Sequence, residues 1–92
     1  MAYAVDFAPA AERQIKAFDR SIQAQLLARI HKLASNPRPN GVEKLEGEEN
    51  LYRIRSGNYR ILYTINDKQL LVLVVKIADR KDVYRRLPKI KK

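Results

Sequence analysis

Apolar and polar residues alternate along two short runs in the middle of the chain, and this period of two predicts a β-hairpin. The runs are residues 51–56 and 59–63, and the two residues between them, Gly57 and Asn58, are of the kinds that favour a tight turn. One face of this hairpin then carries four large side chains that we expect to face the core: Tyr52, Ile54, Ile61 and Tyr63.

The other face of the predicted hairpin carries a cluster of arginines. With a two-residue turn, Arg55 lies opposite Arg60, and Arg53 lies on the same face. Like charges opposite each other destabilise a hairpin, so folding gains little from this arrangement. A three-residue turn is excluded because it would turn Arg60 into the core opposite Ile54. The arginine face therefore predicts a binding site for a polyanion.

Before the hairpin, the pattern predicts one strand and two helices. Residues 2–7 alternate and form the first strand, and Pro9 suits the first turn of a helix. Asp19 is placed as the N-cap of a second helix, whose apolar residues recur every three to four positions. Residues 36–41, which are rich in proline, asparagine and glycine, end that helix.

An acidic stretch precedes the hairpin and a further strand follows it. Residues 42–49 hold four carboxylates, which we interpret as a solvated loop because no further ligands stand at metal-binding spacing. Residues 70–75 are apolar on both faces, as expected of a central strand covered by helices. The predicted order is β-α-α-β-β-β over a single domain, residues 1–92. It is an α+β fold with two helices on one side of a small, mainly antiparallel sheet.

The charge of the chain narrows the class of partner. Its 92 residues carry a net charge of +9, and residues 47–92 account for +7 of it. This excess favours nucleic acid or an acidic protein as the partner, with a merely solubilising surface as the alternative. With no cysteine and a single histidine, His31, neither a disulfide nor a zinc site is expected. We also expect no cofactor, no signal peptide, no membrane contact and a cytoplasmic location.

The arginines suit cleavage of RNA by its own 2′-oxygen, a reaction that requires stabilisation of a pentavalent phosphorane. Guanidinium groups bind phosphate oxygens in pairs, but they stay protonated and cannot act as bases. The usual histidine pair is not available, so Tyr84 is the best candidate for proton transfer, and nearby arginines would favour its phenolate. Tyr84 can equally stack on a base, and the whole face can bind RNA without reacting.

Four segments of the chain together resemble the RelE toxins of the RelE/ParE superfamily. They are KLEG at 44–47, LYRIR at 51–55, GNYRILY at 57–63 and RKDVYR at 80–85, and residues 2–7 also match. The resemblance covers nearly the whole chain and implies a RelE-like fold. It further implies the toxin of a type II toxin–antitoxin pair, an mRNA interferase that cuts codons in the ribosomal A site without a metal.

The same resemblance implies a site made of Arg53, Arg55, Arg60, Arg80 and Tyr84. In such a site Arg60 would steady the phosphorane, Arg80 would neutralise the leaving oxygen, and Tyr84 would orient or deprotonate the 2′-hydroxyl. The implied partners are a RelB-like antitoxin, the ribosome and mRNA, with no DNA contact by the toxin alone. Two alternatives stay open: a ParE-like toxin that inhibits DNA gyrase by protein binding, and a non-catalytic RNA- or ribosome-binding module.

Overall fold

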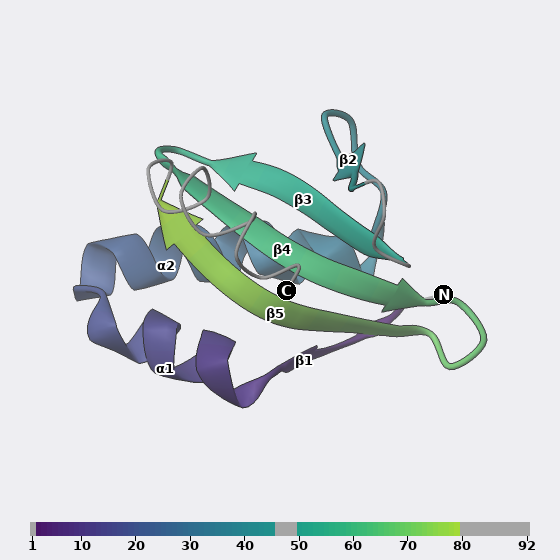
Figure 1. Cartoon of the computed structure of the whole chain (residues 1–92), viewed down its shortest axis with the longest axis horizontal. Coiled ribbons are helices and arrows are strands. Elements are labelled where there is room, and N and C mark those ends of the chain that lie inside the picture. The colour runs from purple at the N-terminus through teal and green to yellow at the C-terminus, as the bar shows by residue number, and fades with distance from the viewer. Residues whose placement is uncertain (1, 46–49, 80–92) are drawn as a thin grey trace.

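The computed structural model describes residues 2–45 and 50–79. Its elements, in chain order, are β1 (Ala4–Phe7), α1 (Pro9–Ala17), α2 (Arg20–His31), the 3₁₀ turn η1 (Lys32–Ala34), β2 (Glu43–Lys44), β3 (Leu51–Ser56), β4 (Tyr59–Asn66) and β5 (Leu71–Asp79). Figure 1 shows the long strands β3, β4 and β5 side by side. Strand β1 lies along β5, and the short β2 lies beside the first residues of β3.

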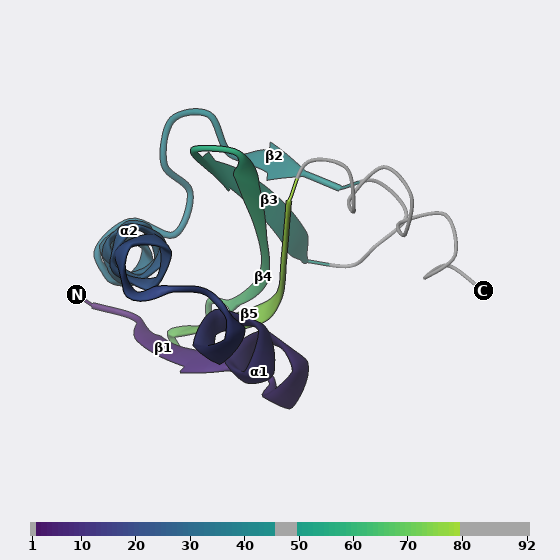
Figure 2. The ribbon, with the colours of Figure 1, turned by 90° about the vertical axis from the view of Figure 1, so that its left-hand side faces the viewer.

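The five strands form one mixed sheet, and both helices lie on the same side of it, as Figure 2 shows. The strand order is β1-β5-β4-β3-β2, with β1 parallel to β5 and the other neighbours antiparallel. The predicted α+β fold, with two helices on one side of a mainly antiparallel sheet, is therefore confirmed. The layer of helices leaves the opposite face of the sheet, called here the outer face, without a helix of the described residues.

One detail of the sequence-based prediction is wrong, and a second is confirmed in part. The stretch predicted as a solvated acidic loop contributes strand β2, because Glu43 pairs with Arg53 across the edge of the sheet and brings opposite charges together. The apolar strand β5 is an interior strand, as predicted, since it pairs with β1 on one side and β4 on the other. The expected cover of helices lies on one face of β5 alone within the described residues, and its outward Leu71 and Leu73 are half-buried.

Local signals explain both helices. Proline stands at the first helical position of α1, where its missing N–H costs nothing. The Asp19 carboxylate caps α2 by accepting a hydrogen bond from the Ile22 amide at 3.1 Å. The α-helix ends at His31, and η1 carries the helical path on to Ala34, shortly before the predicted stop at residues 36–41. The Ala34 carbonyl then accepts a hydrogen bond from the Tyr3 amide, which ties this end of the helical layer to the start of β1.

The core fills the space between the helices and the inner face of the sheet. Its fully buried members on the helical side are Ala11, Leu26, Ile30 and Leu33, and those on the strands include Ile54, Ile61, Tyr63, Val72, Val74 and Ile77. Burial of each leucine, isoleucine or valine among them stabilises the fold by about 1.5–3 kcal/mol. The core thereby fixes the face on which every residue of β3 and β4 lies.

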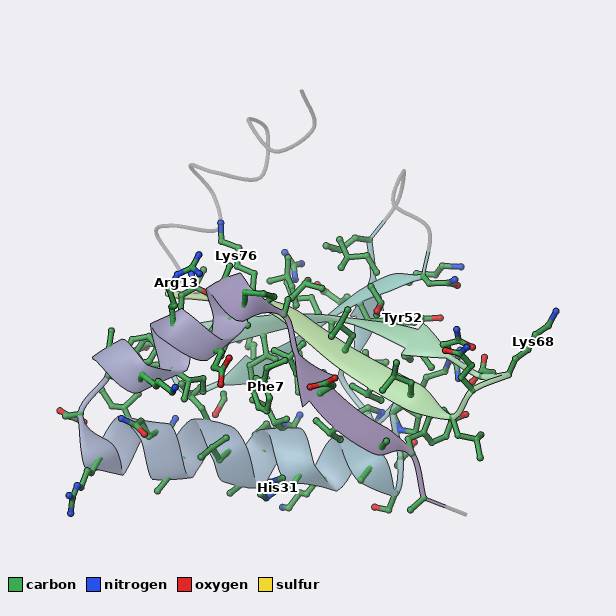
Figure 3. The ribbon with its side chains drawn as sticks, turned by 90° about the horizontal axis from the view of Figure 1, so that it is seen from below. Phe7, Arg13, His31, Tyr52, Lys68 and Lys76 are labelled. Carbon is green, nitrogen blue, oxygen red and sulfur yellow. The ribbon has the colours of Figure 1, made fainter. Side chains whose placement is uncertain are left out.

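Tyr63 and Arg38 secure the end of the sheet away from the β3–β4 turn. The fully buried Tyr63 hydroxyl donates a 2.7 Å hydrogen bond to the Pro37 carbonyl, and burial raises the pKa of this phenol. Arg38 donates to both carboxylate oxygens of Asp67 at 3.2 and 3.0 Å, and its guanidinium lies over the Tyr52 ring. Figure 3 shows Tyr52 at this end, with Lys68 projecting beyond it. These contacts hold the segment before β2 against the strands.

Candidate functional site

The arginines of the hairpin lie on the outer face of the sheet, as their spacing predicts. Arg55 pairs with Arg60 and Arg53 with Leu62 across the antiparallel β3–β4 ladder, while Ile54 pairs with Ile61 on the inner face. The two-residue turn at Gly57 and Asn58 is thus confirmed by the observed register. The left-handed backbone of Gly57, with φ of 61°, explains why glycine stands there.

These three arginines line one cavity of about 470 Å³ at the edge of the sheet. Its walls come from helix α2, the segment before β2, and strands β2, β3 and β4. The lining residues are Arg29, Gly41, Glu43, Arg53, Ile54, Arg55 and Arg60. A cavity with four guanidinium groups and one carboxylate in its described lining has a strongly positive potential and suits an anionic ligand.

Arg60 is the most unusual of these side chains because it is buried, with only 7% of its surface exposed. Within residues 2–45 and 50–79, its guanidinium forms no hydrogen bond or ion pair. A buried cation without a partner costs several kcal/mol of desolvation unless an anion compensates it. In the described part of the chain, this charge is therefore held in place at a cost that a bound anion would offset.

Glu43 places a carboxylate inside the cavity, and the sequence alone did not indicate this. Its Oε1 accepts a 3.0 Å hydrogen bond from Arg53 Nε and forms an ion pair with the same guanidinium. The Arg53 hydrogen bond and charge lower the pKa of Glu43 most, and the charges of Arg60 and Arg55 lower it further. The carboxylate is therefore ionised at neutral pH. Since its side chain is 60% exposed, the pair contributes little to stability.

Two residues of α2 complete the site and were missed at the sequence level. Arg29 Nε donates a 3.1 Å hydrogen bond to the Arg55 carbonyl, and Gln25 Nε2 donates to Ser56 Oγ at 3.4 Å. The two side chains stand one helical turn apart, and each directly precedes a buried residue of the core stripe, Leu26 or Ile30. Polar residues beside a buried stripe are placed to reach the neighbouring element. This position was the feature of the sequence from which Gln25 and Arg29 could have been predicted as site residues.

The other two predicted site residues, Arg80 and Tyr84, lie outside the described residues. Strand β5 runs beside the arginine hairpin up to that point, since Ala78 pairs with Arg60 and the backbone of Asp79 pairs with Tyr59. At residue 79 the backbone of the chain therefore lies beside the end of the hairpin that carries the turn. The roles of Arg80 and Tyr84 stay predictions.

Two features of the described part of the chain concern metal ions and membranes. No cluster of three or more histidine, cysteine or acidic side chains suited to a metal occurs in residues 2–45 and 50–79. The one histidine, His31, is exposed on the side of α2 turned away from the sheet (Figure 3). No described helix has the length and apolar content needed to span a membrane.

Comparison with known proteins places the chain in a family. The family model described as the ParE toxin of the type II toxin–antitoxin system parDE matches residues 5–84. A RelE-like toxin protein of Escherichia coli is 33% identical over 88 residues, which span 91% of this chain and 92% of that protein. The mRNA interferase toxin RelE of Escherichia coli K12 is 30% identical over the same shares of each chain.

Solved structures agree with this placement. The isolated Escherichia coli RelE toxin superposes with a TM-score of 0.75 at 25% identity, covering 99% of this chain and 100% of that one. RelE in the archaeal RelE–RelB complex from Pyrococcus horikoshii gives 0.76 at 28% identity, covering 87% of this chain and 97% of that one. The family model carries the ParE description while these relatives are called RelE, and the two belong together at the level of the superfamily. This chain is a RelE-like member of the RelE/ParE superfamily of type II toxins.

Proposed function

We propose that this toxin is an endoribonuclease that cleaves mRNA in the ribosomal A site. The observation that carries the proposal is the buried guanidinium of Arg60, which forms no hydrogen bond or ion pair within residues 2–45 and 50–79 and shares a cavity with Arg53 and Arg55. A phosphorane carries more negative charge than the phosphate from which it forms, so a fixed guanidinium binds the transition state more tightly than the substrate. The names of two relatives, both called mRNA interferase, support the same activity.

The proposed reaction is attack of the 2′-oxygen on the adjacent phosphorus. The O–P bond forms while the bond from phosphorus to the 5′-oxygen breaks, which gives a 2′,3′-cyclic phosphate and a 5′-hydroxyl end. The 2′-hydroxyl proton passes to a base, and the departing 5′-oxygen gains a proton. In this scheme Arg60 stabilises the phosphorane, Arg80 neutralises the leaving oxygen, and Tyr84 orients or deprotonates the 2′-hydroxyl. Arg53 and Arg55 hold the phosphate backbone in the cavity. No step requires a metal.

The cavity also contains a second candidate for the base, the carboxylate of Glu43. Among the described lining residues, it is the one side chain that can accept a proton, since the others with polar groups are arginines. The two candidates predict different pH profiles. The lowered pKa of Glu43 keeps it ionised, so a Glu43-dependent rate is flat through neutral pH and falls only in acid. A rate that depends on the phenolate of Tyr84 rises with pH through the neutral range.

Comparison of Glu43→Gln with Tyr84→Phe separates these roles. The variant that lacks the base loses kcat by a factor on the order of 10²–10⁴, while the other retains most of its rate. Both proteins must show the circular-dichroism spectrum and unfolding midpoint of a folded chain. If both folded variants cleave at the unaltered rate, neither side chain is the base.

Mapping mRNA 5′ ends after induction of the toxin tests the proposed activity itself. We expect cuts within codons when translating ribosomes are present and no cuts in purified mRNA without ribosomes. Gyrase-dependent DNA breaks with intact mRNA would instead support the ParE-like alternative. Ribosome binding without either lesion would support a non-catalytic module.

The proposed partner is a RelB-like antitoxin, because solved relatives are RelE–RelB complexes. An acidic and partly apolar segment suits the outer face, which carries the arginines toward the β3–β4 turn and half-buried Leu71 and Leu73 toward the other end of the sheet. The toxin alone is proposed to act in the cytoplasm, on ribosomes and mRNA, without DNA contact. Co-expression with the antitoxin of the same operon, followed by co-purification and loss of toxicity, tests the partnership.

A further inference from the structure

We propose that the RNA strand crosses the open edge of β3 and that Arg29 of helix α2 binds one of its phosphates. This inference rests on the proposed function and extends it by a substrate-binding residue and a path for the RNA. The scissile phosphate lies against the outer face of the sheet, and the next phosphate lies on the helical side of the edge strand.

The edge of β3 is open where the arginines are. Strand β2 pairs only with Tyr52 and Arg53, so within residues 2–45 and 50–79 the following residues of β3 have a strand partner on the β4 side alone. Here the Arg29 side chain takes the place of a missing neighbour by donating its Nε–H to the Arg55 carbonyl at 3.1 Å. The guanidinium is therefore held at the point where the outer face and the helical layer meet.

Most of the hydrogen-bonding capacity of Arg29 is left over. A guanidinium has five N–H donors, and the bond to Arg55 uses one of them. Within the part of the chain that the structure describes, the two terminal nitrogens make no hydrogen bond or ion pair. They border the same cavity as Arg55 and Arg60. A half-buried guanidinium already fixed through Nε can bind a phosphate with little further loss of side-chain entropy.

Gln25 forms a second contact that holds helix α2 against strand β3. Its amide donates to Ser56 Oγ one helical turn before Arg29, and it lies against Gly57, whose missing side chain makes room for it. The helix is thus joined to the hairpin at two successive points, Gln25 to Ser56 and Arg29 to Arg55. The position of Arg29 belongs to the fold and does not depend on a bound ligand.

The charge balance of the cavity indicates more than one phosphate. Glu43 neutralises Arg53, which leaves the guanidinium groups of Arg29, Arg55 and Arg60 without a carboxylate in the described lining. One phosphate can be bound by one or two arginines, each of which donates two parallel N–H···O hydrogen bonds to its oxygens. Three guanidinium groups that form no ion pair with a described residue, on the two sides of an edge strand, therefore fit two successive phosphates of one RNA strand.

The test is the salt dependence of binding to a short single-stranded RNA that carries 2′-O-methyl groups and so cannot be cleaved. Fluorescence anisotropy is measured for the wild type, Arg29→Gln, Arg29→Lys and the control Lys68→Gln over a range of salt concentrations. Lys68 is exposed in the β4–β5 turn, at the other end of the sheet (Figure 3), and its substitution removes the same charge. Unfolding midpoints are measured for all four proteins.

We expect Arg29→Gln to bind roughly tenfold more weakly at low salt and to reduce the slope of log K against log salt by about 0.7, the value for one lost phosphate contact. Arg29→Lys keeps the slope although it loses the bond to the Arg55 carbonyl, and Lys68→Gln keeps both affinity and slope. A purely structural role for Arg29 would lower the unfolding midpoint of Arg29→Gln and Arg29→Lys equally and leave both slopes unchanged, which would overturn the inference. A wild type that binds this RNA while Arg29→Gln shows an unaltered slope also overturns it but leaves the proposed function intact. A wild type that binds no RNA at low salt overturns the inference, whereas the proposed function stands or falls by the mapping of mRNA ends.

Discussion

The turn of the arginine hairpin offers a sharp test of how helix α2 supports the site. Gly57 has φ of 61°, and a Cβ added there would lie 2.5 Å from Gln25 Nε2. Gly41 also has a positive φ, 89°, but an added Cβ would meet nothing within 4 Å. The two glycines therefore share backbone strain on substitution, and only Gly57 has a neighbour to displace.

The magnitudes follow from these two environments. A left-handed conformation costs an L-residue about 1–2 kcal/mol, so we expect Gly41→Ala to lower the free energy of unfolding by that amount. Gly57→Ala adds the loss of the Gln25–Ser56 hydrogen bond, about 0.5–1.5 kcal/mol, because the flexible amide must swing away. The expected total is about 1.5–3.5 kcal/mol. For a domain of this size, each kcal/mol shifts the midpoint of thermal unfolding by roughly 4–8 °C.

Urea denaturation followed by circular dichroism measures both variants, since the chain has no tryptophan for fluorescence. A double-mutant cycle of Gly57→Ala with Gln25→Ala isolates the contact between helix and turn, and we expect a coupling of about 0.5–1.5 kcal/mol. The same cycle with Gly41→Ala should show no coupling. The reasoning is refuted if the Gly57 cycle couples by less than about 0.3 kcal/mol, or if Gly41→Ala is the more destabilising substitution.

Three further outcomes follow from buried and paired groups. Arg60→Leu should raise the unfolding midpoint in urea while abolishing the proposed RNA cleavage. The substitution removes a buried cation that has no hydrogen bond or ion pair in the described part of the chain, and it removes the proposed partner of the phosphorane. A destabilised variant would contradict this. Tyr63→Phe should lower the free energy of unfolding by about 1–3 kcal/mol, because it leaves the Pro37 carbonyl without its donor, and a loss below about 0.5 kcal/mol would show that another group satisfies it. Hydrogen bonds from Arg38 lower the pKa of Asp67, so this carboxylate contributes stability above its ordinary pKa and loses that contribution as pH falls. Asp67→Asn should therefore flatten the stability curve below about pH 5, and an unaltered acid slope would exclude the pair as its source.

The sequence contained enough information for the local parts of the site. Alternation along β3 and β4, with glycine and asparagine between them, set the register and the face of Arg53, Arg55 and Arg60, because a shift of one residue would have buried charge. The starts of the two helices, marked by Pro9 and by the Asp19 cap, were equally local. Such features depend on neighbours within a few positions, which a pattern along one chain can reveal.

Contacts between distant segments were not predictable in the same way. The approach of Arg29 to Arg55 spans 26 residues and depends on how α2 packs against the hairpin. Glu43 was interpreted as a solvated acid because its partner, Arg53, comes near it only through the edge pairing of β2. The parallel pairing of β1 with β5 was likewise invisible to periodicity, which indicates that a strand exists but not which strand it pairs with.

The pairing of β1 with β5 has a consequence for how the toxin is made. Ala4 pairs with Leu71, so during synthesis β1 cannot join the sheet until β5 has been made. Until β5 leaves the ribosome, β4 has no neighbour on that side, and the hairpin that carries the arginines lacks the layer that stiffens it. If the toxin cleaves mRNA on the ribosome as proposed, we expect the nascent chain to be inactive until β5 has joined the sheet. The proposed antitoxin then has the interval between synthesis of the hairpin and completion of the sheet in which to bind.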